Sequence, residues 1–522
     1  MAENRPLLAR MSKLLGWFAF VWLLFGTCWG QSPAQRYALG RRLQRFERAW
    51  QTADHDRRLA TTPTMEKAVG SFFSLQIAQA NQLLDEAWMI ASGVPEDERR
   101  IRQPWNAYYV DVEVPVIDAD AKRMRVRLLT GYPDPQTDGA SDASAAADAP
   151  SSAAALPGRL MLWGEDGSGT RTESLGTWDH PRSSEWIDVS VAALPLGEHR
   201  LKASFQHDDG KPFDWIAESI CIVRNAERLQ QDVNKWLEDH RGNRPDTLWM
   251  TSKLIAKEWS RALQGQPMEI DPPWDTWLAH WETLSSSDAS LKPLVSGAGT
   301  GQCWLDLATD AGHQVVRVWV PEEKLSSESA PGDVPASRPV VFAFHGAGGS
   351  ENMFFETYGA GRLIELAKEH GWIVVAPRQN LLAGKLALNV GPMLDELSGL
   401  IPIDRKRVGL IGHSMGAAQA ITQVSSDPTQ VTAVVAIGGG GRANRSAELQ
   451  RVPFWIAAGA RDFGKSGAKA LADRLSDSGC AVEYREYPDI EHMVIVQASL
   501  DDATEFLVKA FEKAPGRSIQ DR

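Results

Sequence analysis

The chain has 522 residues, which is too long for one hydrophobic core and predicts two or three domains. Its content of 43% hydrophobic and 23% charged residues is typical of globular proteins and excludes a fibrous or largely disordered chain. The formal net charge of -12 leaves no basic excess to neutralise phosphates. It therefore argues against nucleic acid, and against an anionic membrane surface, as the main partner.

The first 30 residues have the order of an export signal. Arg5, Arg10 and Lys13 precede an uncharged apolar run at 14–30, as in a secretory signal peptide. An uncleaved membrane anchor is one alternative, because spanning a bilayer takes about 17–25 apolar residues. An acylated lipoprotein is another, because Cys28 ends a poor version of a lipoprotein box. We expect an exported protein, secreted or periplasmic, that meets a membrane only through this segment.

Residues 31–103 carry apolar side chains at helical spacing, for example Leu43, Phe46 and Trp50. This pattern predicts two amphipathic helices that meet at 61–63, where the sequence is Thr-Thr-Pro. We interpret the segment as a helical cap packed on the domain that follows, and a partner-binding hairpin is the alternative.

The segment 104–225 changes to a period of two. About seven short strands separated by turn signals predict a β-sandwich of immunoglobulin-like type. The expected strands are 109–116, 123–129, 160–163, 186–191, 200–205 and 215–223. The Ala-, Ser- and Asp-rich stretch 138–157 is predicted to be a disordered loop within this domain. Residues 226–300 return to helical spacing and are predicted to form a helical connector.

Tryptophan and cysteine usage suggests packing rather than chemistry. Trp163, Trp178 and Trp215 in the predicted sandwich are interpreted as core residues, with a sugar-binding aromatic platform as the alternative. The three cysteines beyond the N-terminal segment allow at most one disulfide and are expected to be buried thiols. They are Cys221, Cys303 and Cys480. No His and Cys cluster has zinc-ligand spacing, so we predict no metal site.

Residues 301–515 alternate strands and helices, which predicts a mainly parallel sheet covered on both faces. A strand at 408–411 runs directly into Gly412-His413-Ser414-Met415-Gly416, and a helix begins at once. A nucleophile on so sharp a turn adopts strained backbone angles, so the residues two before and two after it must be small. Gly412 and Gly416 meet this need. We therefore predict Ser414 to be the nucleophile of a serine hydrolase.

A serine hydroxyl needs a base, and the base needs a carboxylate to orient it. His492 is the only histidine after Ser414, so it is expected to be the base. Asp462 opens the loop after the apolar strand 452–458 and is expected to be the acid. Asp489 is the competitor, but it shares a short loop with His492.

The oxyanion hole needs two backbone N–H donors. Met415, directly after the nucleophile, is expected to supply one, and Ala347, in the turn after strand 340–344, the other. We interpret His345 as a residue that holds this turn. The sharp turn at 412–416, which we call the elbow, is expected to point His413 away from the triad.

Three further segments bear on the substrate. The loops 352–361 and 381–388 are expected to determine specificity. Glycines 438–441 precede Arg442 at the sheet edge where ligands bind in such folds, but a P-loop pattern is absent. A contact between Arg442 and a substrate carboxylate or sugar is a hypothesis.

The motifs together resemble the α/β-hydrolase family, and within it secreted esterases related to polyhydroxybutyrate depolymerases and to feruloyl or acetylxylan esterases. They are His345-Gly346-Ala347-Gly348-Gly349-Ser350, Ile403-Asp404-Arg405-Lys406-Arg407-Val408, Gly412-His413-Ser414-Met415-Gly416, Asp462 and His492. The resemblance covers about 315–513. It implies an acyl-enzyme formed by attack of Ser414, proton relay by His492 and hydrolysis by water, without a cofactor.

The expected function is hydrolysis of carboxylic esters outside the cytoplasm, with esters linked to polysaccharides or polyesters among the candidate substrates. Two alternatives stay open. One is a serine peptidase of the same fold, and the other is a binding or envelope protein with an idle hydrolase domain.

Overall fold

The structure is a computed structural model that describes residues 33–132, 155–156, 158–166, 171–207, 212–215, 218–242, 246–269, 271–284, 289–295, 302–310, 312–321, 337–379 and 388–514. The expected export segment 1–30 lies outside the described residues, and so does the predicted loop 138–157 apart from Ala155 and Leu156. Within the described ranges, no helix is both long and apolar enough to cross a membrane.

Four helices precede the β-strands in the described part of the chain. They are α2 (Pro33–Thr52), α3 (His55–Phe73), α4 (Ile77–Ala91) and α5 (Glu96–Asn106). The predicted junction at 61–63 is wrong, because Pro63 lies inside α3. The break falls at Asp54, whose carboxylate accepts the Arg57 N–H at 2.9 Å and begins α3. Apolar packing of Met65 and Ala68 on α2 and α4 outweighs the roughly 3 kcal/mol that an interior proline costs.

Two β-sheets follow and share one core. The strands are β1 (Tyr108–Val112), β2 (Val116–Asp118), β3 (Arg123–Thr130), β4 (Gly158–Asp166), β5 (Arg171–Asp179), β6 (Ile187–Ser190), β7 (Gly197–His207), β8 (Pro212–Trp215) and β9 (Ser219–Val223). One sheet has the order β1-β3-β6, and the other β2-β9-β7-β4-β5 with β8 beside β7. Val126 of the first sheet and Leu201 of the second belong to the same buried cluster.

This sandwich differs from the prediction in three places. The expected strand 109–116 is divided between β1 and β2, which belong to different sheets. The expected strand 215–223 is divided between β8, which ends at Trp215, and β9, which begins at Ser219. Strand β5 was not expected, because polar and small residues obscure its alternation. Trp178 packs partly against the sandwich core, as predicted for a core residue. The immunoglobulin-like type stays a prediction.

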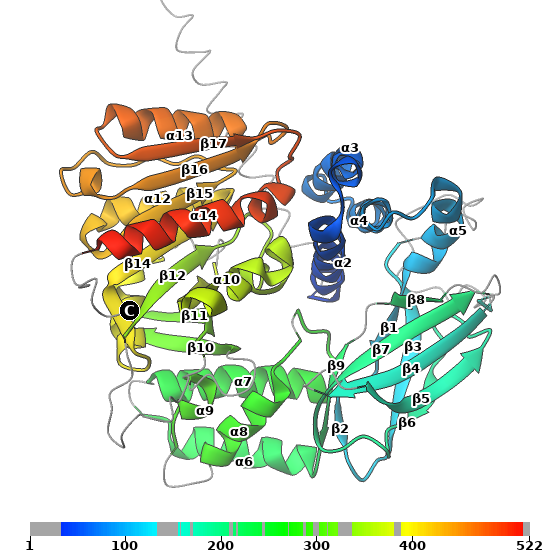
Figure 1. The fold of residues 1–522 in the computed structure, drawn as a ribbon. Coiled ribbons are helices and arrows are strands. Elements are labelled where there is room, and N and C mark those ends of the chain that lie inside the picture. The colour runs from blue at the N-terminus through cyan, green and yellow to red at the C-terminus, as the bar shows by residue number, and fades with distance from the viewer. Residues whose placement is uncertain are drawn as a thin grey trace, which may run out of the picture.

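The helices after the sandwich do more than connect. They are α6 (Ala226–Asp239), α7 (Thr247–Leu263), α8 (Trp274–Leu284) and α9 (Lys292–Val295). Trp259, Trp274 and Trp281 are buried among them, and the Trp259 and Trp281 rings meet edge to face at 4.3 Å. These residues belong to one buried cluster with the strands of the C-terminal sheet. The predicted connector is therefore part of the core that supports the C-terminal domain (Figure 1).

The C-terminal part is built on an eight-stranded sheet of order β10-β11-β13-β12-β14-β15-β16-β17. The strands are β10 (Gln302–Thr309), β11 (Gly312–Trp319), β12 (Arg338–Phe344), β13 (Ile373–Pro377), β14 (Ile403–His413), β15 (Ala433–Ile437), β16 (Phe454–Gly459) and β17 (Val482–Tyr487). β11 is antiparallel to β10 and β13, and the pairs from β13 to β17 are parallel. The mainly parallel sheet predicted for this region is present.

Helices cover both faces of this sheet (Figure 1). They are α10 (Arg362–His370), α11 (Val390–Ser398), α12 (Met415–Ser426), α13 (Lys465–Asp477) and α14 (Val494–Lys513), with short turns η1 (Met353–Thr357), η2 (Tyr358–Gly361), η4 (Pro428–Gln430) and η5 (Leu449–Arg451). Successive strand residues face opposite sides, so Phe342 packs with α12 and α13 while Val341 packs with α10 and α14.

Two further features concern the placement of residues. Cys221, Cys303 and Cys480 are buried, and within the described ranges they are free thiols. Helix α2 lies against the turns η1 and η2 of the C-terminal part, far from it in sequence. The N-terminal helices therefore reach the C-terminal domain as well as the sandwich.

Candidate functional site

Ser414 occupies a strained turn between β14 and α12. Its backbone angles are φ 56° and ψ −115°, a region that L-residues rarely adopt. A side chain at position 412 would place its Cβ 2.1 Å from the Gly416 carbonyl oxygen, so glycine is required there. The Ser414 N–H donates to the Ile437 carbonyl at 2.8 Å and ties the turn to β15. This is the geometry that presents a serine hydroxyl above the ends of parallel strands.

The structure brings Ser414, His492 and Asp462 into one hydrogen-bonded chain. His492 Nε2 lies 3.0 Å from Ser414 Oγ, and His492 Nδ1 lies 2.6 Å from Asp462 Oδ1. Asp462 Oδ1 also accepts the Gly464 N–H at 2.6 Å, which fixes the carboxylate. Asp462 and His492 are only 5% and 2% exposed, so water does not compete for these bonds. A carboxylate at Nδ1 leaves Nε2 as the acceptor for the serine proton.

The structure also shows the positions of Asp489, the competing acid, and of glycines 438–441 relative to the triad. The partner of His492 Nδ1 is Asp462 and not Asp489. Within the glycine run, a Cβ at position 438 would lie 2.8 Å from Asp462 Oδ2, and one at position 439 would lie 2.2 Å from the Ser414 carbonyl oxygen. The run therefore lets β15 and the acid approach the elbow closely. Arg442 is exposed and is not among the described residues that line the pocket.

The two expected oxyanion donors flank Ser414. Met415 is the first residue of α12, so its N–H lies at the positive end of the helix, without a partner in the preceding turn. Ala347 lies in the turn after β12 and lines the same pocket as Ser414. This turn is close to the nucleophile, because a Cβ at position 346 would lie 3.4 Å from Ser414 Cβ. The arrangement could hold a negative oxygen between the two loops.

His413 does not point away from the triad, which corrects the prediction. Its Nε2 lies 2.8 Å from the His492 carbonyl oxygen, and its Nδ1 lies 2.8 Å from Tyr358 Oη. Burial, together with the nearby His492, holds the pKa of His413 well below its usual value, so the ring is neutral. Nε2–H therefore donates to His492 and Nδ1 accepts from Tyr358, whose oxygen accepts the Gly346 N–H at 3.2 Å.

These hydrogen bonds connect the turn that carries Ala347 to the loop that carries His492. Sequence reasoning missed Tyr358, because a tyrosine in an irregular loop carries no motif. His345 remains within its own turn, where its Nδ1 lies 2.8 Å from the Gly346 carbonyl oxygen, as expected of a residue that holds the turn. Burial lowers the pKa of His345, so this ring is also neutral.

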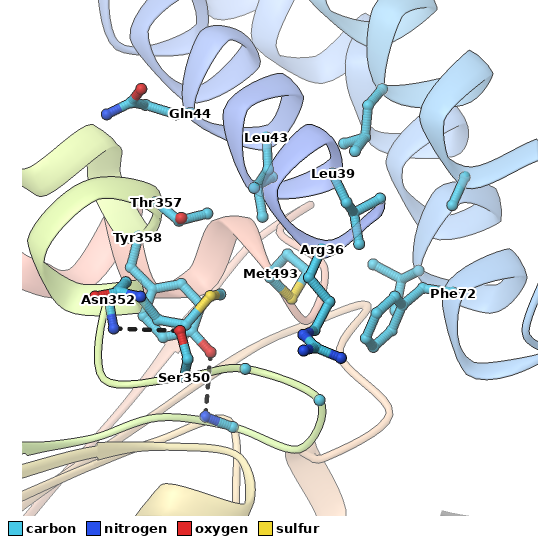
Figure 2. Close-up of a pocket in the computed structure, with 18 of the residues that line it drawn as sticks. Arg36, Leu39, Leu43, Gln44, Phe72, Ser350, Asn352, Thr357, Tyr358 and Met493 are labelled. Carbon is cyan, nitrogen blue, oxygen red and sulfur yellow. Dashed lines mark hydrogen bonds between the residues drawn. The ribbon is translucent and has the colours of Figure 1, made fainter. Parts of the chain in front are cut away.

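An apolar pocket opens onto Ser414 and has walls from both ends of the chain. The C-terminal wall includes Gly346, Ala347, Gly348, Gly349, Ser350, Asn352, Met353, Thr357, Tyr358, His413, His492 and Met493. The N-terminal wall includes Leu39, Gly40, Leu43, Met65, Ala68, Val69, Phe72, Phe73, Ala80 and Leu84. Figure 2 shows Leu39, Leu43 and Phe72 pointing into the pocket, on the side opposite Tyr358 and Met493.

This pocket bears on the two loops expected to determine specificity. Five residues of the loop 352–361 line it, and the role of this loop in specificity stays a prediction. Most of 381–388 lies outside the described residues. The contribution of α2, α3 and α4 was missed, since an amphipathic pattern does not reveal which partner a helix covers.

Over the described ranges, no group of three or more His, Cys, Asp or Glu side chains could hold a metal ion.

No protein-family model and no curated protein sequence matches the chain. Solved structures that resemble it include a fluorophosphonate-binding serine hydrolase from Staphylococcus aureus, at 15% identity and TM-score 0.33, over 40% of this chain and 98% of that one. An S-formylglutathione hydrolase from Agrobacterium tumefaciens has 17% identity and TM-score 0.32, over 40% and 96%. A thermostable esterase has 14% identity and TM-score 0.35, over 68% and 94%. Likeness of this degree carries no argument about activity, which rests on the residues of this chain.

Proposed function

We propose that the chain is a serine-dependent hydrolase of carboxylic esters that works through an acyl-enzyme. The observation that carries this proposal is the buried chain of Ser414 Oγ, His492 and Asp462, with 3.0 Å and 2.6 Å between successive partners. A serine hydroxyl is a weak nucleophile until a base in this position accepts its proton.

The reaction begins when Ser414 Oγ attacks the ester carbonyl carbon and His492 Nε2 takes the hydroxyl proton. The carbonyl oxygen becomes an oxyanion, which the N–H groups of Ala347 and Met415 stabilise. As the tetrahedral intermediate collapses, the C–O bond to the alcohol breaks and His492 gives its proton to the leaving oxygen. Asp462 holds the charged ring throughout. Water then attacks the acyl-enzyme with His492 as base, releasing the acid and restoring Ser414.

We propose further that the enzyme acts outside the cytoplasm. The support is the order of basic residues and apolar run in the first 30 residues. An ester attached to a polysaccharide or polyester remains a candidate substrate for an exported enzyme.

Hydrolysis of p-nitrophenyl esters by the wild type and by Ser414→Ala tests the proposal. The variant should lose roughly 10⁶-fold in kcat, because removing the nucleophile alone disables the whole triad. The matched control is Ser425→Ala on the same helix, where the hydroxyl only bonds the Ile421 carbonyl at 2.7 Å. This control should keep full activity.

Peptide p-nitroanilides, assayed in parallel, distinguish an esterase from a peptidase. Because an activated ester is intrinsically more reactive than an anilide, a peptidase also cleaves esters. Cleavage of the anilides that is lost in Ser414→Ala would therefore make the chain a peptidase, whereas cleavage of esters alone would make it an esterase. A wild type that is inactive on every ester, or a Ser414→Ala variant that is as active as the wild type, would refute the proposed function.

A further inference from the structure

The apolar wall nearest the nucleophile belongs to the N-terminal helices. Phe72 packs so closely on the oxyanion turn that a Cβ at position 348 would lie 2.6 Å from its ring. The ring centroid of Phe73 lies 6.3 Å from that of His492. Leu39 and Leu43 extend the same wall along α2 (Figure 2). These helices therefore border the reacting atoms directly.

The wall is held on the C-terminal domain by polar contacts. The Glu66 carboxylate on α3 receives two hydrogen bonds from Arg461, at 2.6 and 2.7 Å, next to Asp462 in sequence. Buried Glu47 on α2 accepts the Gly359 N–H with its carboxylate. The Glu47 carbonyl accepts from Gln497 at 3.0 Å. Because both α2 and α3 make such contacts, the wall is fixed to the C-terminal domain.

The charged groups that the described pocket contains are already paired. The pairs are Arg36 with Glu269, Arg41 with Asp271 at 3.0 Å, and Glu356 with Arg317 at 2.7 Å. A charged substrate group in the pocket would have to break one of these pairs or stay unpaired, and an unpaired buried charge is costly. The group that fills the pocket is therefore uncharged, and the side chains around it favour an apolar one.

The two sides of Ser414 differ in exposure. His492 Nε2 delivers its proton to the leaving oxygen, so the alcohol must lie beside His492. On that side Phe463 is 58% exposed, with its ring centroid 3.9 Å from that of His492. The carbonyl oxygen lies toward Ala347 in the proposed reaction. The remaining substituent of the carbonyl carbon, the acyl chain, is then directed into the pocket.

We propose that α2, α3 and α4 form the acyl-binding wall of the active site, and that the substrate is an ester with an extended, uncharged, apolar acyl group. This rests on the proposed function. The alcohol lies on the side of His492, between Phe73 of the wall and the exposed Phe463.

The test is kcat/KM of the full-length protein along a series of p-nitrophenyl esters from acetate to decanoate. Each methylene that enters the pocket should raise kcat/KM roughly fourfold, until the pocket is full. Leu39→Trp adds bulk to the wall from a partly buried position. The ratio of kcat/KM on the longest esters that the wild type prefers to kcat/KM on acetate should fall roughly tenfold or more in this variant. The matched control is Leu59→Trp, at a position that is 42% exposed on α3 and outside the pocket.

The outcomes separate this proposal from the function on which it rests. Equal kcat/KM for all acyl chains, with loss of activity in Ser414→Ala, would overturn the acyl wall and leave the esterase intact. A Leu39→Trp variant that resembles Leu59→Trp on every ester would overturn it as well. If acetates of lengthening alcohols show the dependence instead, the pocket holds the alcohol. No hydrolysis of any ester by the wild type would overturn both proposals.

Discussion

Replacing His413 by phenylalanine tests whether this buried ring holds His492 in place for catalysis. The His413 ring contacts no reacting atom, but its Nε2–H donates to the His492 carbonyl at 2.8 Å. Its Nδ1 accepts from Tyr358 at the same distance. Phenylalanine fills a similar volume and removes both bonds. We regard His413 as a positioning residue, which acts through the backbone of the base.

The expected loss of stability follows from the two groups that lose a hydrogen bond to His413. The His492 carbonyl and the Tyr358 O–H would lose this partner while buried, although the Tyr358 oxygen would still accept the Gly346 N–H, and each buried polar group that goes unpaired costs about 1–3 kcal/mol of folding stability. Movement of the His492 backbone would shift Nε2 relative to Ser414 Oγ. A misplacement of about 1 Å can cost roughly 100-fold in rate. We therefore expect kcat to fall roughly 10- to 100-fold with little change in KM.

The assay is steady-state hydrolysis of a p-nitrophenyl ester combined with urea unfolding. His280→Phe is the matched control, because His280 is also buried and bonds Ser252 Oγ at 3.0 Å, in a region outside the pocket. It should lose stability and keep its kcat. His413→Gln, which can restore a donor, should recover part of the lost rate. If His413→Phe loses stability like the control but keeps the wild-type kcat, the positioning role is refuted.

Two other predictions concern stability. Burial lowers the pKa of His280 from 6.5 to about 4. As the pH falls through this window the unfolded chain binds a proton that the folded protein does not. Stability should therefore drop by about 3 kcal/mol between pH 6.5 and 4, and urea titrations should show no such contribution in His280→Phe. Arg42→Leu removes the nearer cation of buried Asp85, which lies 3.0 Å away, and leaves only Arg45 at 4.0 Å. It should cost about 3–5 kcal/mol, and adding Asp85→Leu should recover much of this in thermal or urea unfolding. A double variant no more stable than the single one would contradict this.

The sequence alone was sufficient wherever the chemistry depends on neighbours along the chain. The elbow at Ser414 needs a strand, small residues at 412 and 416, and a helix, and all of these are local. The assignment of His492 needed only the order of residues, since no other histidine follows Ser414. The triad could be named for this reason, although its distances could not.

The tertiary structure decided which distant surfaces meet. Glu47 and Gly359 are 312 positions apart, and their contact places α2 over the active site. Hydrophobic periodicity predicts that one face of a helix is buried, but it does not say against what. The same pattern is compatible with α2 packed wholly on the sandwich. The predicted helix boundary at Pro63 was wrong because tertiary packing outweighed the tendency of proline to end a helix. The nucleophile could therefore be predicted from the sequence. The wall of α2, α3 and α4 could not, because it forms only when distant segments meet in the folded chain.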